Sequence, residues 1–323
     1  MSTIRVEEPG LLTTVQDLGR EGFGPLGVSA SGAADPIALR LGNRLVGNAE
    51  NAAALEMTLV GGAFAFPEGG VVALTGSDFG AMLDGNNVGT WESLEVPRGA
   101  TLRVGPSRSG ARGYLCVQGG IVVTPFLGSS STHVMTGLGG YQGRPLRAGD
   151  VLQVGAATAP FRRRTVDPSV FAELWPHTIA DRASGEPMRI RVTDGEQSAW
   201  FAEAARGAFA ANVYRVSEQT NRMGIRLEGT PVAEQSGGRM VTEGVSLGAV
   251  QIPPGGLPII LFVEQQTTGG YPKIANVITA DLASLGQLRP RDVVRFERVQ
   301  VAAARSVLFR REQLLRSRKI IVE

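Results

Sequence analysis

The chain has very little cysteine and histidine, and these scarcities exclude several kinds of chemistry. Cys116 is the single cysteine among 323 residues, so no internal disulfide can form and a reducing cytoplasm is expected. The thiol lies in the apolar run GYLCVQGG, which predicts a buried structural side chain rather than a nucleophile. The two histidines, His133 and His177, stand in no metal-ligand spacing, so no metal site is predicted.

Long apolar runs and an excess of charge of one sign are also missing. No apolar stretch approaches the ~20 residues that a membrane helix needs, and the first residues lack the charged-then-apolar plan of a signal peptide. The formal net charge is +2, so neither a nucleic acid nor a membrane is predicted as a partner. The one basic cluster, at residues 310–319, is interpreted as a solvated helix face.

Compact catalytic signatures are absent as well. The sequence contains no G-x-x-x-x-G-K-[ST] phosphate-binding loop and no G-x-S-x-G nucleophile elbow. Asp78 and Asp84 are close enough in sequence to suggest paired carboxylates, but DGNN (84–87) is typical of a hairpin turn. Asp78, which follows Thr-Gly-Ser, remains a candidate for a group that faces a pocket.

Glycine, proline and short apolar runs are plentiful: there are 43 glycines and 18 prolines, and 43% of the residues are hydrophobic. Short apolar runs separated by Gly/Pro turns indicate a mainly β protein with few helices, built from barrels or sandwiches. Strands are predicted over residues 71–74, 101–104, 189–192 and 293–296. Helices are predicted over residues 35–48 (with Asp35 as N-cap, Pro36 at the first position and Gly47 at the end), 167–177, 195–209 and 302–316.

A weak internal repeat suggests how the chain is organised. In each half an apolar run enters a Gly-Gly loop, and each half later ends in Leu-Arg, two residues, an Asp and a β-like run, at residues 146–154 and 288–296. Together with the length, this predicts two domains, residues 1–180 and 181–323, with the last helix in the second. The alternative is that Gly-rich β sequences resemble one another without any duplication.

Three stretches combine glutamine, arginine, carboxylate and glycine without a nucleophile: TTVQDLGREGF (13–23), NRMGIRLEG (221–229) and EQQTTGGYPK (264–273). Glutamine offers a donor and an acceptor together, arginine binds carboxylates with a fork of donors, and glycine lets backbone N–H groups approach a ligand. The three together favour recognition of an amide or ureido edge, and arginine–carboxylate pairs that join strands are the structural alternative. GSSST (128–132) is a candidate anion nest or a structural turn.

These stretches, with LTGSDF (74–79) and GYLCVQGGIVVTPFLGSSST (113–132), resemble the KipA family, in family order from about Val6 to Phe296. This family is also known as the 5-oxoprolinase C subunit or allophanate hydrolase subunit 2, and it is similar to one half of the carboxyltransferase region of urea carboxylase. The resemblance implies two cyclophilin-like β-barrel domains. Two positions depart from the family pattern: Glu264 stands where Asp is common, and Arg291 replaces a turn glycine.

The resemblance also implies a function and partners. It implies an ATP-dependent 5-oxoprolinase, in which this chain works with a KipI-like protein (the B subunit) and a LamB/YcsF-like protein (the A subunit) to open the 5-oxoproline lactam to glutamate. ATP is then used by the complex, and no cofactor is assigned to this chain. The alternative is a carboxyltransferase component that moves a carboxyl group from carboxybiotin to urea or a related amide. A third hypothesis is a non-enzymatic regulator that binds a KipI-like kinase inhibitor.

Lactams, urea and the biotin ring all present planar N–H and C=O edges, and fixed hydrogen-bond donors polarise the carbonyl group. The predicted catalytic residues are therefore Gln266, Tyr271 and Lys273: Tyr271 stacks on or bonds to the ligand, and Lys273 balances its developing charge. The chain is expected to be inactive alone, with a site that a second polypeptide completes. Substrate-binding roles are predicted for Gln16, Asp17, Arg20, Ser129, Ser130, Arg222, Thr267, Thr268, Gly269 and Gly270.

Overall fold

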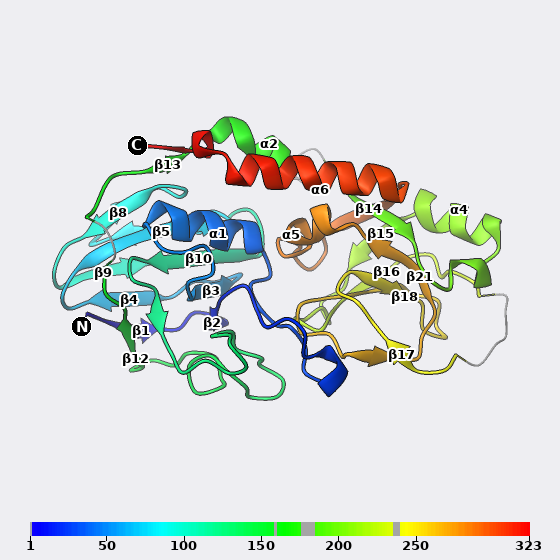
Figure 1. Ribbon diagram of the computed structural model, residues 1–323, viewed down its shortest axis with the longest axis horizontal. Coiled ribbons are helices and arrows are strands. Elements are labelled where there is room, and N and C mark those ends of the chain that lie inside the picture. Colours follow the sequence, from blue (N-terminus) through cyan, green and yellow to red (C-terminus); the bar gives the residue numbers. More distant parts are fainter. Residues whose placement is uncertain (1, 158–159, 176–184, 235–239) are drawn as a thin grey trace. The chain divides into compact units, whose positions relative to one another are not determined.

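The computed structural model describes residues 2–157, 160–175, 185–234 and 240–323, apart from the side chain of Arg318. These residues divide between two compact units (Figure 1). The boundary predicted near residue 180, and His177 with it, lies outside the described residues, whereas the observed division falls between Ser169 and Val170. The first unit holds the residues up to Arg20, Ser31–Ser169 and Arg318–Glu323, and the second holds Glu21–Ala30 and Val170–Ser317.

The first unit consists of two antiparallel sheets around one hydrophobic core. Their strand orders are β11-β12-β1-β4-β9-β6-β7 and β2-β3-β10-β5-β8. Leu55, Phe64 and Leu115 come from both sheets and are fully buried in this core. The strands are β1 (Thr3–Glu8), β2 (Thr13–Gln16), β3 (Ala54–Thr58), β4 (Ala63–Phe66), β5 (Gly70–Gly76), β6 (Met82–Leu83), β7 (Asn86–Asn87), β8 (Ser93–Val96), β9 (Ala100–Arg103), β10 (Arg112–Val117), β11 (Ile121–Val122), β12 (Val151–Val154), and the separate pair β13 (Thr165–Val166) and β23 (Ile321–Val322).

Helix α1 (Pro36–Leu45) begins and ends as its sequence predicts. Asp35 Oδ1 accepts a hydrogen bond from the Ala38 N–H at 3.0 Å, and Pro36 occupies the first turn, where no intrahelical partner for an N–H exists. Gly47 follows the helix with φ of 77°, the left-handed conformation that ends many helices. The apolar stripe of the helix is buried, and the helix packs against β5 and β10.

The second unit is built on a closed seven-stranded barrel with the order β14-β21-β18-β19-β16-β15-β22. β14 and β22 run parallel, and the other neighbours are antiparallel. Buried aromatic rings pack together in this unit, and the stacked rings of Phe209 and Phe296 lie 4.4 Å apart between centroids. The strands are β14 (Met188–Asp194), β15 (Val213–Val216), β16 (Gly224–Glu228), β18 (Ala249–Gln251), β19 (Ile259–Leu261), β21 (Lys273–Val277), β22 (Val293–Arg298), and the separate pair β17 (Glu243–Gly244) and β20 (Thr268–Gly269).

Helices are few, as expected. The predicted helix over residues 195–209 is interrupted because Phe201 adopts an extended conformation. In the described part of the chain, no helix has the length and apolar character needed to cross a membrane. The remaining helices and 3-10 turns are η1 (Gly24–Leu26), η2 (Pro168–Val170), α2 (Phe171–Leu174), η3 (Ser198–Trp200), α4 (Glu203–Ala211), η4 (Thr279–Asp281), α5 (Leu282–Leu285), α6 (Val301–Arg316) and η5 (Arg318–Ile320).

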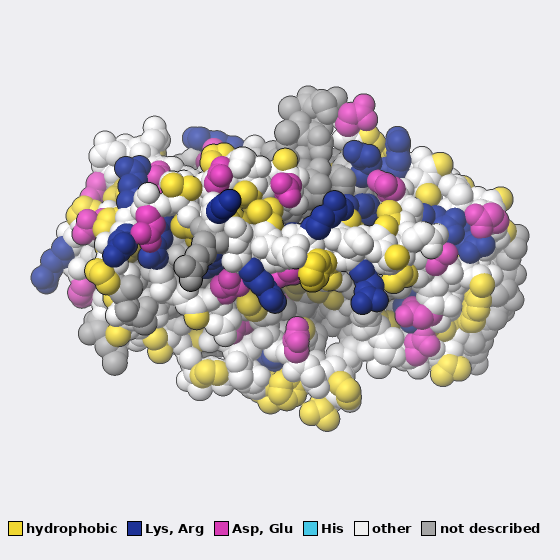
Figure 2. All heavy atoms as spheres, turned by 45° about the horizontal axis from the view of Figure 1, so that its top comes forward, with side chains coloured by type: hydrophobic (Ala, Val, Ile, Leu, Met, Phe, Trp, Pro, Cys, Tyr) yellow, Lys and Arg dark blue, Asp and Glu magenta, His cyan; other side chains and the backbone are white. Residues whose placement is uncertain are grey.

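Helix α6 carries the basic cluster, and one of its arginines lies inside the second unit. Arg311 is buried, and its guanidinium donates to the carbonyl oxygens of Ala280 and Thr279, the latter at 3.2 Å. Arg310 and Arg316 are exposed, as a solvated helix face requires. On the face of the molecule drawn in Figure 2, Lys and Arg side chains are interspersed with Asp and Glu. The solvated-face interpretation therefore holds for part of the cluster, and Arg311 is a correction to it.

The mainly β architecture with a barrel and few helices is confirmed, and the four predicted strands agree with β5, β9, β14 and β22 to within two residues at each end. The DGNN stretch forms the expected hairpin, in which Asp84 and Gly85 have φ of 46° and 85° between β6 and β7. Asp78 accepts the Gly80 N–H at 2.7 Å and forms an exposed ion pair with Arg108 at 3.4 Å. The two aspartates are thus turn residues.

Both units contain the same turn, at residues 146–150 and 288–292, and this supports the internal repeat. The matched bonds are Gly149 N–H to Val6 O, Arg147 N–H to Asp150 Oδ2, Arg291 N–H to Val216 O and Arg289 N–H to Asp292 Oδ2. Gly149 has φ of 89° and Arg291 has φ of 74°. Arg291 therefore holds a left-handed conformation that favours glycine, which is the strain that its place in the repeat predicts.

Candidate functional site

The polar loop of the second unit, residues 264–273, follows β19 and exposes some side chains while burying others. Gln266, Thr268 and Tyr271 are exposed, and Tyr271 keeps 44% of its surface open to solvent. Gly269 is buried, because β20 pairs with β17 and holds the middle of the loop as a two-stranded ribbon. Amide, hydroxyl and phenol groups thus form a surface of neutral hydrogen-bonding groups.

Lys273, at the end of this loop, is buried, and its ammonium contacts two carboxylates. Nζ forms an ion pair with Glu243 Oε1 and lies 3.5 Å from Glu196 Oε2. Gln197 Nε2 donates to the same Glu243 oxygen at 2.8 Å. These bonds, with the one from Lys273 as the largest cause, lower the pKa of Glu243 below its ordinary value. The ammonium is therefore engaged within the fold, and its predicted role toward a ligand stays a prediction.

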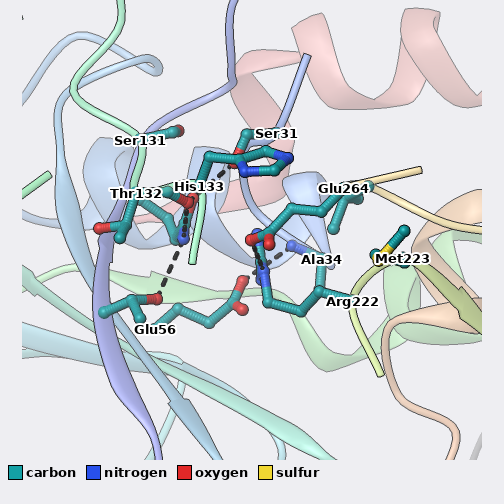
Figure 3. Close-up of polar contacts among 12 residues, drawn as sticks. Ser31, Ala34, Glu56, Ser131, Thr132, His133, Arg222, Met223 and Glu264 are labelled. Atoms are coloured by element: carbon teal, nitrogen blue, oxygen red, sulfur yellow. Dashed lines mark hydrogen bonds and ion pairs between the residues drawn. The ribbon is translucent and has the colours of Figure 1, made fainter. Parts of the chain in front are cut away.

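Arg222 and Glu264 form a buried ion pair, drawn in Figure 3. Arg222 Nε contacts Glu264 Oε1, and the Glu264 N–H donates back to the Arg222 carbonyl at 2.8 Å. Arg222 precedes β16 and Glu264 follows β19, and these two strands are neighbours in the barrel. The pair therefore fixes the point at which the polar loop leaves the barrel. The substrate-binding role predicted for Arg222 stays a prediction.

Gln251 is a residue that the sequence did not single out. It lies on β18 opposite Lys273, it is 1% exposed, and its Nε2 has no hydrogen-bond partner among the described residues. Gly269 covers it so closely that a Cβ at Gly269 would come within 2.5 Å of Nε2. In the sequence, Gln251 is a single glutamine at the end of a short apolar run, and this pattern does not indicate a functional role.

In the first unit, Asp17 organises the GSSST stretch. Its Oδ1 accepts the Gly19 N–H at 2.8 Å and the Ser129 hydroxyl at 2.6 Å, and the Ser131 hydroxyl also donates to Oδ1. Its Oδ2 accepts the Ser130 N–H at 2.6 Å. The stretch therefore forms the nest that its composition suggests, but the anion in it is the protein's own buried carboxylate.

Arg20 is buried beside the same stretch. Its guanidinium donates to the Ser131 carbonyl and, at 3.3 Å, to the Phe126 carbonyl, and it lies 5.5 Å from the centre of the Phe126 ring. Gly139 is close to this guanidinium, since a Cβ there would come within 2.8 Å of Nη2. Arg20 and Asp17 together hold the stretch from Phe126 to Ser131, the guanidinium through its carbonyl groups and the carboxylate through its N–H and hydroxyl groups.

Gln16 is fully buried, and its amide contacts the next residue of the stretch. Nε2 donates to Thr132 O and to Thr14 Oγ1, each at 3.0 Å, and Oε1 has no hydrogen-bond partner among the described residues. The Ser31 hydroxyl donates to the same Thr132 carbonyl at 2.8 Å (Figure 3). The structure thus brings together the predicted residues of the first unit around one loop, and their direct binding of a ligand stays a prediction.

A second buried carboxylate in the first unit, Glu56 of β3, was missed by the sequence analysis. Its Oε2 accepts the Tyr114 hydroxyl at 2.7 Å and the Ala34 N–H at 2.8 Å, and Arg112 Nε lies 3.7 Å from Oε1. The Asp35 N–H donates to the Tyr114 hydroxyl at 2.8 Å. Burial, followed by the charges of Glu56 and Asp35, raises the pKa of Tyr114 well above its ordinary value. The network fixes the beginning of α1.

Cys116 and His133 are both buried. The predicted structural thiol is confirmed: Cys116 is fully buried on β10, and burial raises its pKa. His133 Nδ1 lies 2.8 Å from the Thr136 hydroxyl, within the turn that follows the GSSST stretch. In the described ranges, no three Asp, Glu, His or Cys side chains gather as metal ligands do.

Comparison with known proteins defines the class. Residues 26–298 match the carboxyltransferase domain, subdomain A and B, and the chain belongs to this family. It is 38% identical over 311 residues to the 5-oxoprolinase C subunit of Escherichia coli (strain K12), covering 96% of this chain and 95% of that protein. It is 36% identical over 312 residues to the 5-oxoprolinase C subunit of Haemophilus influenzae, covering 96% of each.

A solved structure agrees with this placement. The crystal structure of the K. lactis urea amidolyase is similar at a TM-score of 0.88 and 31% identity, covering 99% of this chain and 21% of that chain. The chain therefore spans about a fifth of that larger protein. The family resemblance inferred from the sequence motifs is confirmed by both kinds of comparison.

Proposed function

We propose that this chain is the C-type component of an ATP-dependent 5-oxoprolinase, which opens the lactam ring of 5-oxoproline to give glutamate. The observation that carries the proposal is the 38% identity to the E. coli 5-oxoprolinase C subunit over 96% of this chain and 95% of that protein. The match covers nearly the full length of both chains. A shared single motif would not support a shared role in this way.

The polar loop supports the proposal chemically. When water adds to a lactam carbonyl, negative charge develops on the oxygen, and donors fixed in advance stabilise it. Gln266 and Tyr271 are exposed and carry such donors on a loop whose start is fixed by the buried Arg222–Glu264 ion pair. Thr267, Thr268 and the backbone of Gly270 add further groups to the surface. In this proposal Gln266 and Tyr271 contact the lactam, and Lys273 holds the end of the loop.

The first unit, taken by itself, also holds a polar loop in a fixed position. Asp17, Arg20 and Gln16 are buried and bonded to the stretch that contains Ser129 and Ser130. Their rigid bonds fix that stretch, and the half-buried Ser130 is the member that a substrate can contact. A site needs supporting side chains of this kind to hold its geometry.

In this proposal ATP is used by the complex, and no ATP site is assigned to this chain, whose sequence has no G-x-x-x-x-G-K-[ST] loop. The proposed partners are a KipI-like protein as B subunit and a LamB/YcsF-like protein as A subunit, in the cytoplasm, and the chain is inactive without them. The test is to assemble the three chains and to measure ATP hydrolysis with and without 5-oxoproline. We expect ATP hydrolysis that depends on 5-oxoproline and that disappears when this chain is left out. An equal rate of ATP hydrolysis with and without 5-oxoproline would contradict the proposal.

A carboxyltransferase component is the second candidate, and a specific observation favours it. The matching family is a carboxyltransferase domain, and the similarity to the urea amidolyase structure covers 99% of this chain. Under this candidate, the same loop binds the ureido edge of urea or of carboxybiotin. The discriminating measurement supplies carboxybiotin and urea to the chain with its partners, and follows transfer of labelled carboxylate. Transfer without lactam-dependent ATP hydrolysis would favour this candidate over the first.

A further inference from the structure

Gln251 places a hydrogen-bond donor beneath the polar loop that no described protein group satisfies. The residue is 1% exposed, and its Nε2 lacks a partner within the described ranges. Folded proteins pair nearly all of their buried polar groups, and an unpaired donor destabilises the fold. A ligand that accepts a hydrogen bond from Gln251 Nε2 would explain why this donor is unpaired in the folded chain.

Two backbone features direct this amide at the loop. β18 and β21 pair with a register shift at Gln251, and irregularities of this kind re-aim side chains beside functional sites. Gly269 lies on the amide, since a Cβ there would come within 2.5 Å of Nε2 and 3.0 Å of Val245 Cγ1. The missing side chain at Gly269 therefore lets the backbone of the loop meet the amide.

The segment that covers Gln251 is held by few bonds. β17 and β20 pair over two residues each, and the Val245 N–H donates to Thr267 O at 3.1 Å. The ion pair between Lys273 and Glu243 also connects β17 to the end of the polar loop. Short ribbons of this kind open at a smaller free-energy difference than a closed barrel does. A ligand at the exposed loop can therefore displace Gly269 and reach the amide.

The chemistry of a primary amide indicates which ligand fits. The glutamine side chain carries a donor and an acceptor on one edge. A lactam or ureido ring presents C=O and N–H on one edge, because ring closure fixes the cis amide. An open-chain secondary amide is trans and places the two groups on opposite edges. Cyclic amides, ureido groups and primary amides can therefore make both bonds to one glutamine, whereas an open-chain secondary amide can make only one.

We propose that Gln251 is a substrate-binding residue that selects cyclic amides, with Nε2 donating to the lactam carbonyl oxygen once Gly269 has moved off it. This inference rests on the proposed function and adds a specificity residue, on β18, to the same proposed site. Gln251 makes and breaks no covalent bond, so its contribution is to affinity and orientation. The ligand then provides the acceptor that the folded chain lacks at this position.

The test replaces the amide by an apolar group of similar length, Gln251→Met, in the full chain assembled with its partner proteins. We expect KM for 5-oxoproline in the ATPase assay to rise about five- to tenfold while kcat changes less than about twofold, since one hydrogen bond is lost. The Tm of the variant is expected to rise, because the unpaired donor is gone. A residue with a structural role alone would leave KM unchanged and lower Tm.

The matched control is Asn276→Leu on β21. Asn276 Oδ1 also lacks a hydrogen-bond partner among the described residues, but Asn276 lies opposite Ala249, away from the bulge. We expect its KM to equal that of the wild type. Gln251→Glu is the second variant: it keeps the length and loses the donor, and we expect a larger rise in KM than for Gln251→Met.

The outcomes separate the inference from the function on which it rests. An unchanged KM for both Gln251 variants in an active complex overturns the inference. A lower Tm for Gln251→Met also overturns it, because the amide would then already have a protein partner. Absence of lactam-dependent turnover in the wild-type complex overturns the proposed function, and the inference falls with it.

Discussion

The side chains that suit a ligand in this protein are mostly buried and bonded to the fold. Asp17 and Arg20 hold one stretch of backbone, and Arg222 is paired with Glu264. A charge inside a protein must be paired, so the residue types that recognise amides and carboxylates also make internal ion pairs. Sequence alone could therefore name these residues but could not choose between the two roles.

At the residue scale, Glu264→Ala is expected to lower the free energy of unfolding by about 3–5 kcal/mol, because it leaves the Arg222 guanidinium buried without its carboxylate. Urea denaturation measures this difference. The control is Glu218→Ala, which removes the exposed partner of Arg291 and is expected to change stability by less than about 1 kcal/mol. An equal decrease in the free energy of unfolding for the two variants would show that the buried ion pair stabilises the fold no more than the exposed one.

At the element scale, short turns and ribbons decide how the loops are held. The same turn occurs at residues 146–150 and 288–292, with glycine in one copy and arginine in the other. The polar loop depends on a ribbon of two residues per strand and on the ion pair at its edge. Both features can be tested without touching the barrel.

Gly149→Ala is expected to destabilise the chain by about 1–2 kcal/mol through the backbone alone. Its φ is 89°, and no atom lies within 4 Å of the added Cβ, so no clash contributes. In the other copy, Arg291→Gly is expected to be more stable than Arg291→Ala, because both variants lose the side chain and only glycine relieves the φ of 74°. Thermal unfolding of the three variants measures both differences, and equal stability of the two Arg291 variants would refute the strain.

The ribbon of β17 and β20 is expected to loosen in acid. Bonds from Lys273 and Gln197 lower the pKa of Glu243, so the folded state favours its carboxylate. The resulting stabilisation is present above the ordinary pKa of glutamate, and it is lost as the pH falls through the lowered value. Hydrogen exchange of the Val245 amide, which bonds to Thr267 O, measures the opening. We expect its protection to fall in this acid range, and Glu243→Gln to remove that pH dependence.

Sequence predicted the local elements well because their signals lie within a few residues. The cap of α1 and the DGNN hairpin were correct in detail, since Asp35 acts on Ala38 and a turn of two residues sets its own strands. The predicted helix over residues 195–209 was partly wrong, because Phe201 is drawn into the core and breaks it. Burial of that ring is a tertiary effect, which periodicity does not contain.

At the scale of the whole molecule, the two units do not correspond to two continuous pieces of sequence. Residues 21–30 belong to the second unit and residues 318–323 to the first. β23 pairs with β13, and Ile320 is fully buried. A single boundary in the sequence cannot describe such an exchange, because the returning segments are too short to carry a pattern of their own.

Deletion of residues 318–323 is therefore expected to lower the Tm of the chain by about 5–10 °C, since it removes a buried isoleucine and a strand pairing. Differential scanning calorimetry measures the shift. Glu323→Ala is the control, because it removes only the exposed ion pairs with Arg162 and Arg164. A deletion that behaves like this control would show that β23 is dispensable.

The sequence by itself determined the fold class, the family and the neutral hydrogen-bonding loop. These depend on residue types and spacings that are complete within short stretches. Only the tertiary structure decided which polar groups form hydrogen bonds and ion pairs inside the protein. Asp17 meets Ser131 across 114 positions and Arg222 meets Glu264 across 42, while Gln251 meets Gly269 and finds no partner for its donor among the described residues. A hydrogen bond depends on position in space, and separation along the chain does not reveal it.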